Sequence, residues 1–306
     1  MPNSPVLTKG QVVPIPSSVM RRALGLKLAE TRHSTMMVSA GSEQGRNDLD
    51  LGIEALTQAT LLTQETGMDW DAFFAVHRDL PREGPGLAED VAWAGQLIGI
   101  SPQGFVCDAG CGPGGDLAAL RQLVPHGRID GFETVSHFVE AAREKFSGDP
   151  SVRIFEASME HLSGPYDLIW SAGAVYFLGV PRALNAWRSA LADNGAVAFS
   201  HPCLFTDTPS EAALAFWEAE PGSIETEATT CAQIAAIGWQ VLATRTLSDA
   251  AWTAYYGPLL TRCDTLEAAG TSASVAAAIA AARKEASDWS AVAGQTGYVL
   301  YVVRPV

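Results

Sequence analysis

Five short apolar segments between residues 105 and 201 alternate with segments of helical pattern, and this alternation limits the chain to one class of fold. Parallel strands need long crossover connections, usually helices, so the repetition predicts a parallel sheet covered by helices on both faces. The five segments are FVCDAG, RIDGFE, VRIFEAS, YDLIWSAG and GAVAFSH, and two more follow them, WQVLATRTL and TGYVLYVVRP. We therefore predict an α/β fold with a seven-stranded, mostly parallel sheet.

Three parts of the chain fall outside this alternation. Residues 1–67 contain two helical patterns and predict a helical extension that packs on the main domain, 68–306, or on a second subunit. Residues 202–230 and 248–296 are too long for simple connections, so they predict helical insertions near strands five to seven. In an open α/β sheet the ligand lies beyond the carboxyl ends of the strands, where such insertions could cover it.

The charge balance and the cysteines limit the partners and the compartment. The chain has 20 Lys and Arg against 34 Asp and Glu, a formal net charge of −14 at pH 7. Nucleic acids and anionic membranes both require clustered basic residues, so neither is expected as a partner. There is no long apolar run or signal peptide, and the five scattered cysteines predict reduced thiols, hence a cytoplasmic protein without a metal site.

The segment DAGCGPGG carries the clearest chemical signal. Its glycines suit a sharp turn or a close approach of the backbone to a ligand, and the helix that follows offers unpaired N–H groups. Asp108 precedes the first glycine by two residues and would repel a pyrophosphate, whereas it suits a ligand that carries an ammonium or sulfonium group. Pro113 also removes one N–H that a phosphate would need. The segment therefore favours a cationic ligand.

Together with four later motifs, this segment resembles the class I S-adenosylmethionine-dependent methyltransferases. The later motifs are RIDGFE, EASMEHL, YDLIWSAGAVYFLG and LADNGAVAFS. The resemblance implies a Rossmann-like fold and S-adenosyl-L-methionine as cofactor. It implies that the cofactor is bound by Gly84, Asp108, Gly110, Cys111, Gly112, Gly114, Glu133, Thr134, Ser158, Met159 and Ser171.

The same resemblance implies particular roles for three of these residues. Glu133 matches the acid that binds both ribose hydroxyls, Ser158 would lie near the adenine amine, and the Met159 N–H would meet a ring nitrogen. Simpler alternatives stay open: Asp108 could cap the next helix, Glu133 could be a solvated strand end, and Ser158 could cap a helix that begins at Met159. The wider chain, from about residue 70, is similar to a group of uncharacterised bacterial small-molecule methyltransferases, and the similar segments in this chain are REGPG, DLIWSAGAVYFLGV, LFTDTPSEAALAFW and TGYVLYVV. Ala172 replaces a glutamate of that group.

Two residues beyond strands four and five, Tyr176 and His201, are the catalytic candidates. His201 could act as a base or an acceptor ligand because an imidazole titrates near neutral pH, or it could be a hydrogen-bonded residue at a strand end. A base is needed only if the acceptor arrives protonated. The aromatic residues of the two insertions could wall an acceptor pocket or form insertion core, and they include Trp217, Trp252, Tyr255 and Tyr256.

The function implied by the resemblance is methyl transfer from S-adenosylmethionine to a small-molecule acceptor by in-line displacement, governed by positioning. A catalytically silent, regulatory S-adenosylmethionine-binding protein is one alternative. A nicotinamide-dependent oxidoreductase is another, which Asp108 and the lack of a G-x-G-x-x-G spacing in GCGPGG oppose. The acceptor stays open, and a homodimer could form through residues 1–67.

Overall fold

The computed structural model describes residues 69–217 and 224–306. The helical extension expected over 1–67 lies outside the described residues, as do residues 218–223 of the first insertion. All seven predicted strands are present. They are β1 (Phe105–Ala109), β2 (Arg128–Glu133), β3 (Val152–Glu156), β4 (Tyr166–Ala172), β5 (Leu191–Leu204), β6 (Trp239–Thr246) and β7 (Thr296–Pro305).

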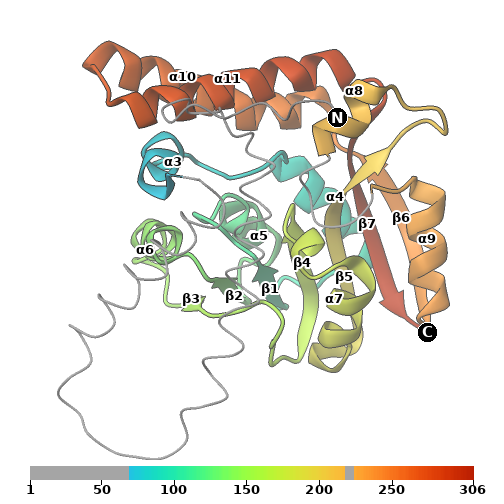
Figure 1. Ribbon diagram of the computed structural model, residues 1–306. Helices are drawn as coiled ribbons and strands as arrows, with labels where there is room; N and C mark the ends of the chain where they lie inside the picture. Colours follow the sequence, from blue (N-terminus) through green and yellow to red (C-terminus); the bar gives the residue numbers. More distant parts are fainter. Residues whose placement is uncertain (1–68, 218–223) are drawn as a thin grey trace, which may run out of the picture.

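The strands form one sheet in the order β3-β2-β1-β4-β5-β7-β6, which confirms the predicted Rossmann-like fold (Figure 1). Strands β1 to β5 pair in parallel, and β7 lies antiparallel between β5 and β6. A strand that is covered on both faces needs a nearly continuous apolar sequence, and β7 has one in GYVLYVV. The order reverses between β1 and β4, the switch point at which open α/β sheets bind their ligands.

Helices cover both faces of the sheet because neighbouring strand residues point in opposite directions. In β4, Leu168 belongs to the same buried cluster as Leu120 of α5, whereas Ile169 belongs to a second cluster with Leu184 of α7. The helices on the first face are α4 (Ala88–Ile98), α5 (Leu117–Leu123) and α6 (Ser136–Lys145). The second face carries α7 (Val180–Trp187), α9 (Glu227–Ala236) and two short 3₁₀ helices, η1 (Val175–Phe177) and η2 (Arg188–Ala190).

Four further helices form what we call the roof, which lies along one end of the molecule (Figure 1). Its members are α3 (Trp70–His77), α8 (Glu211–Trp217), α10 (Asp249–Ala269) and α11 (Ala273–Val292). α10 and α11 lie side by side, and α11 also packs on α3 and α8. The helical insertions expected near strands five to seven are therefore present. None of the described helices is long and apolar enough to span a lipid bilayer.

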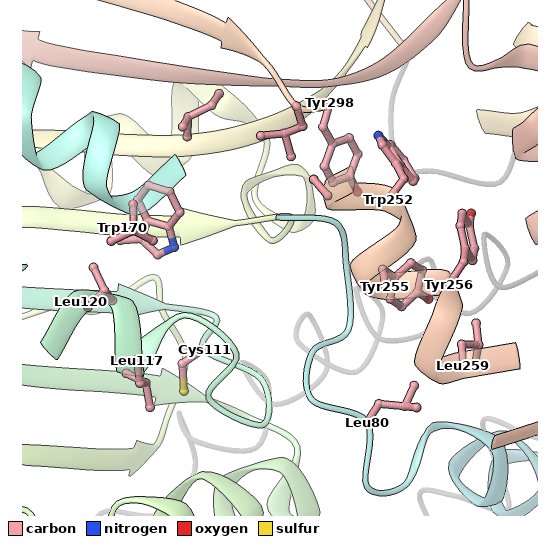
Figure 2. Packing of buried hydrophobic residues seen from close by; sticks show 14 of the residues in the cluster. Leu80, Cys111, Leu117, Leu120, Trp170, Trp252, Tyr255, Tyr256, Leu259 and Tyr298 are labelled. Carbon is pink, nitrogen blue, oxygen red and sulfur yellow. The ribbon is translucent and has the colours of Figure 1, made fainter. Parts of the chain in front are cut away.

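Aromatic stacking holds the roof to the sheet. The rings of Trp252 on α10 and Trp289 on α11 stack with centroids 3.5 Å apart. Trp252 also lies against Tyr298 of β7, with ring centroids 5.4 Å apart (Figure 2). Trp217 stacks on Tyr298 and donates a 2.7 Å hydrogen bond to Thr296. These tryptophans are thus insertion core, one of the two readings left open by the sequence.

Candidate active site

A cavity with about 1130 Å³ of empty space, part of it open to solvent, lies beyond the carboxyl ends of the parallel strands. Its floor is formed by the residues that end or follow β1, β2, β3 and β4. The segment before α4 forms one side, and α3, α10 and η1 form the other.

The glycine-rich turn after β1 is fixed by its backbone. The N–H groups of Gly110 and Cys111 both donate to the carbonyl of Phe132, at 2.9 and 3.0 Å. Gly110 has φ +82°, and a Cβ there would lie 2.5 Å from the Cβ of Ala174. Both observations require glycine, because other residues rarely adopt this conformation and no space is left for a side chain. The turn therefore lies directly against the start of η1.

Asp108 is a buried carboxylate at the tip of β1 that lines this cavity. It is 2% exposed, and no hydrogen bond from another described residue reaches it. Burial raises the pKa of Asp108 well above its ordinary value, the carboxylates of Asp116 and Glu133 raise it further, and Arg82 opposes them. α5 begins after Asp116, so Asp108 does not cap that helix. A buried carboxylate without a partner is costly, and a bound cation would relieve that cost.

Glu133, at the tip of β2, accepts three backbone hydrogen bonds. The donors are the N–H groups of Gly112 at 3.0 Å, Thr134 at 2.7 Å and Val135 at 2.9 Å. Burial raises the pKa of Glu133, while these three bonds act in the opposite direction. Glu133 is therefore not a freely solvated strand end. Its carboxylate joins the glycine-rich turn to the tip of β2.

The REGPG segment, residues 82–86, is clamped onto the glycine-rich turn by Arg82. The guanidinium donates to both oxygens of Asp116, at 3.2 and 3.4 Å, and to the carbonyls of Gly84 and Gly86. Asp116 also accepts a 3.0 Å hydrogen bond from the indole of Trp170. This network places Gly84 on the wall of the cavity.

The far side of the cavity is mostly aromatic. Phe73 of α3, Tyr255 of α10, and Tyr176 and Phe177 of η1 line it. Tyr255 and Tyr256 leave α10 in different directions, and only Tyr255 reaches the cavity (Figure 2). Sequence reasoning singled out Tyr176 and Tyr255 but missed Phe73, whose helix carries no motif.

A histidine–glutamate pair on the cavity wall joins α3 to the REGPG segment, and the sequence did not indicate it. Nδ1 of His77 lies 2.7 Å from Oε2 of Glu83. Burial raises the pKa of Glu83, and the contact with His77 opposes that shift. Glu83 belongs to the REGPG segment, which was recognised as a motif, whereas His77 has no sequence signal of its own.

Most of the sequence-predicted site residues meet in the cavity. It is lined by Gly84, Asp108, Gly110, Cys111, Gly112, Glu133, Thr134, Met159 and Tyr176. Gly114, Ser158 and Ser171 are not among the lining residues. The Gly114 N–H closes the turn onto Cys111, and Ser171 donates to the carbonyl of Ala109 at 2.7 Å. The Ser158 hydroxyl accepts the N–H of Glu160 in a turn, and no helix begins at Met159.

His201 lies away from the cavity. It pairs with Val299 in the middle of the β5–β7 ladder, and its side chain shares the α7 and α9 face with Phe199 and Cys203. Burial lowers the pKa of His201 to about 4, and its Nδ1 is buried with no partner among the described residues. The position of His201 therefore does not fit the expectation that it is a base beside the acceptor. Strand alternation puts Ser200 on the site face instead, where its hydroxyl accepts the Gly173 N–H.

Comparison with known proteins identifies a family for the central part of the chain. Residues 106–195 match the family model described as a methyltransferase domain. A comparison with curated proteins finds no match. A methyltransferase from Geobacter sulfurreducens, solved with S-adenosyl-L-homocysteine, has a TM-score of 0.67 at 16% identity over 77% of this chain and 98% of its own.

Two further solved structures have the same TM-score of 0.67 and 16% identity. One is a methyltransferase from Thiobacillus denitrificans with S-adenosyl-L-homocysteine, matched over 76% of this chain and 98% of its own. The other is YjhP from E. coli, matched over 77% of this chain and 99% of its own. At this identity the likeness concerns the fold, and the matched domain identifies the activity. Residues 106–195 thus match a methyltransferase domain, and the chain has the fold of solved S-adenosylmethionine-dependent methyltransferases.

Proposed function

We propose that this enzyme transfers the methyl group of S-adenosylmethionine to a small-molecule acceptor bound between the glycine-rich turn and the roof. The observation that carries the proposal is Asp108, a buried carboxylate that faces the cavity with no partner among the described residues. The ammonium group of the cofactor supplies the positive charge that this position requires. The glycine-rich turn beside it allows close approach of the ligand.

The residues around Asp108 fit the rest of the cofactor. Glu133 holds the ribose hydroxyls, since its two oxygens offer about four acceptor positions and three backbone donors leave capacity for more. Met159, which lines the same cavity, meets the adenine through its N–H. When bound, the cofactor supplies an electrophilic methyl group. The chain supplies position, and it excludes water from the reaction.

The far side of the cavity supports an enzyme over a silent binder. Phe73, Tyr176 and Tyr255 line space beyond the residues assigned to the cofactor, which leaves room for an acceptor. The carboxylate of Asp108, next to the glycine-rich turn, opposes a dinucleotide pyrophosphate there, and the net charge of −14 opposes a nucleic acid. The five cysteines are free, which suits a cytoplasmic location. A homodimer through residues 1–67 stays a prediction.

The test is a calorimetric titration of the wild type with S-adenosylmethionine, S-adenosylhomocysteine and NADH. We expect the first two to bind and NADH not to bind. Asp108→Ala should weaken S-adenosylhomocysteine binding by about 100-fold or more, because a desolvated charge pair is worth roughly 2–5 kcal/mol. Glu140→Ala, at an exposed position on α6, is the matched control. Unchanged affinity in Asp108→Ala, or tight NADH binding, would overturn the proposal.

A further inference from the structure

One titratable pair on the cavity wall has no role assigned to it in cofactor binding. It consists of His77, at the end of α3, and Glu83, which precedes the cofactor-side Gly84. His77 is 3% exposed, and its ring also packs on Phe73 with centroids 3.9 Å apart. Two contacts therefore fix the orientation of the imidazole.

The contact with Glu83 leaves one ring nitrogen for a bound molecule. Nδ1 is engaged by the carboxylate at 2.7 Å, so the neutral ring carries its proton there. Within the described residues Nε2 has no hydrogen-bond partner, and it is not one of the buried polar atoms left unpaired. His77 lines the cavity, and Nε2 is the ring nitrogen left to accept a proton from a molecule bound there. An imidazole whose Nδ1–H is held by a carboxylate is the arrangement that orients a general base and stabilises its protonated form.

The other charged groups of the cavity do not contact His77. Those that line it are Arg82, Glu83, Asp108, Asp116 and Glu133. Arg82 is bound to Asp116, and Glu133 is bound to backbone N–H groups. Of these groups Glu83 alone contacts His77. A proton taken up by His77 is therefore stabilised by one adjacent carboxylate.

The walls around the pair indicate the shape of the acceptor. Phe73, Tyr255, Tyr176 and Phe177 present aromatic rings, and residues 172–174 between them are small. Aromatic side chains favour offset or edge-to-face contact with another ring. Ala172 stands where the similar bacterial sequences carry a glutamate, so no acid opposes an apolar ring there.

We propose that His77 is the general base of the reaction, positioned by Glu83, and that the acceptor is an aromatic compound with a phenolic hydroxyl. This inference rests on the proposed methyl transfer. The hydroxyl gives its proton to Nε2 of His77 while its oxygen forms a bond to the methyl carbon. The carbon–sulfur bond breaks with its electron pair going to sulfur. The products are an aryl methyl ether and neutral S-adenosylhomocysteine, and the proton leaves His77 for solvent.

The test is a radiolabelled methyl-transfer assay with catechol, 1-naphthol and 4-nitrophenol, set against thiophenol and aniline. We expect the wild type to methylate at least one phenol. His77→Asn should lower kcat about 100-fold or more, the usual contribution of a positioned base, and should remove the acidic limb of the pH–rate profile. Glu83→Gln should lower kcat less and displace that limb. His126→Gln, at an exposed position, is the matched control and should leave the rate unchanged.

A parallel titration with S-adenosylhomocysteine separates the two proposals. Both variants should keep its affinity within about twofold, because neither residue is assigned to the cofactor. An unchanged phenol rate in His77→Asn, turnover of thiophenol or aniline alone, or no turnover of any phenol would overturn the inference. If the wild type does not bind S-adenosylhomocysteine, the proposed function itself is overturned.

Discussion

The two sides of the cavity are built in different ways. The cofactor side consists of strand tips and a glycine-rich turn, where backbone N–H groups and carboxylates make the contacts, as Glu133 and Asp108 do. The roof side consists of helices from both ends of the described chain, held by stacked rings such as Trp252 and Trp289. The first side depends on a few exact backbone positions, whereas the second depends on the packing of large side chains.

This difference separates what each side contributes to function. Removing a polar contact on the cofactor side should reduce binding of the methyl donor more than it reduces stability. Removing a large ring from the roof should do the opposite, because its energy comes from buried apolar area. The following experiments test that division.

The largest expected effect is on the stability of the roof. Trp289→Ala removes the ring that stacks on Trp252, and we expect the free energy of unfolding to fall by about 3–5 kcal/mol, as for other buried Trp-to-Ala changes. Denaturant unfolding measures this loss. Titration of the folded variant should give nearly wild-type affinity for S-adenosylhomocysteine. A large loss of affinity at preserved fold would show that the two sides are coupled.

The second-largest expected effect is a loss of stability when the clamp between REGPG and the glycine-rich turn is removed. Arg82→Ala leaves Asp116 buried without its cation, so we expect about 2–3 kcal/mol lower stability, less than for a fully buried pair because the Arg82 side chain is 13% exposed. Affinity for S-adenosylhomocysteine should fall as well, since Gly84 loses its support. Trp170→Phe removes one hydrogen bond to Asp116 and part of a buried ring but keeps the Arg82–Asp116 ion pair, so it serves as the comparison that spares the cation. Equal affinity in Arg82→Ala and wild type would contradict the clamp.

The smallest effect is a pH dependence of cofactor binding. Burial raises the pKa of Asp108, and a bound ammonium group would lower it again. Binding should therefore release protons and strengthen as pH rises, by at most about tenfold per pH unit for one linked proton. Titrations in two buffers of different ionisation enthalpy measure the protons released. Asp108→Asn should reduce that number, and an unchanged number would assign the protons to Glu133.

The sheet and the cofactor side were largely predictable from the sequence, because local patterns encode them. Apolar segments identified all seven strands, and DAGCGPGG placed an acid and a glycine turn at one strand tip. The position of β7 between β5 and β6 was not predictable, since strand order depends on pairing between distant segments. His201 was misplaced for a related reason, because one residue along a strand reverses the face that a side chain occupies.

The roof side was much harder to predict. The sequence predicted a helical insertion over 248–296 but did not identify α10 within it, because α10 includes Pro258, a residue that disfavours a helix interior. Its buried face of Trp252, Tyr255 and Leu259 outweighs that local preference. Nothing in the sequence indicates that His77, near the start of the described chain, would share a cavity with Tyr255.

The packing of α3 against α10 and α11 has a consequence for biosynthesis. Arg262 of α10 donates a 3.2 Å hydrogen bond to the carbonyl of Ala75, so an early helix is completed by a late one. A nascent chain on the ribosome can already hold the strands that end in Asp108 and Glu133 while Tyr255 has not yet been translated. The residues assigned to the methyl donor are therefore synthesised before the residues that enclose the acceptor.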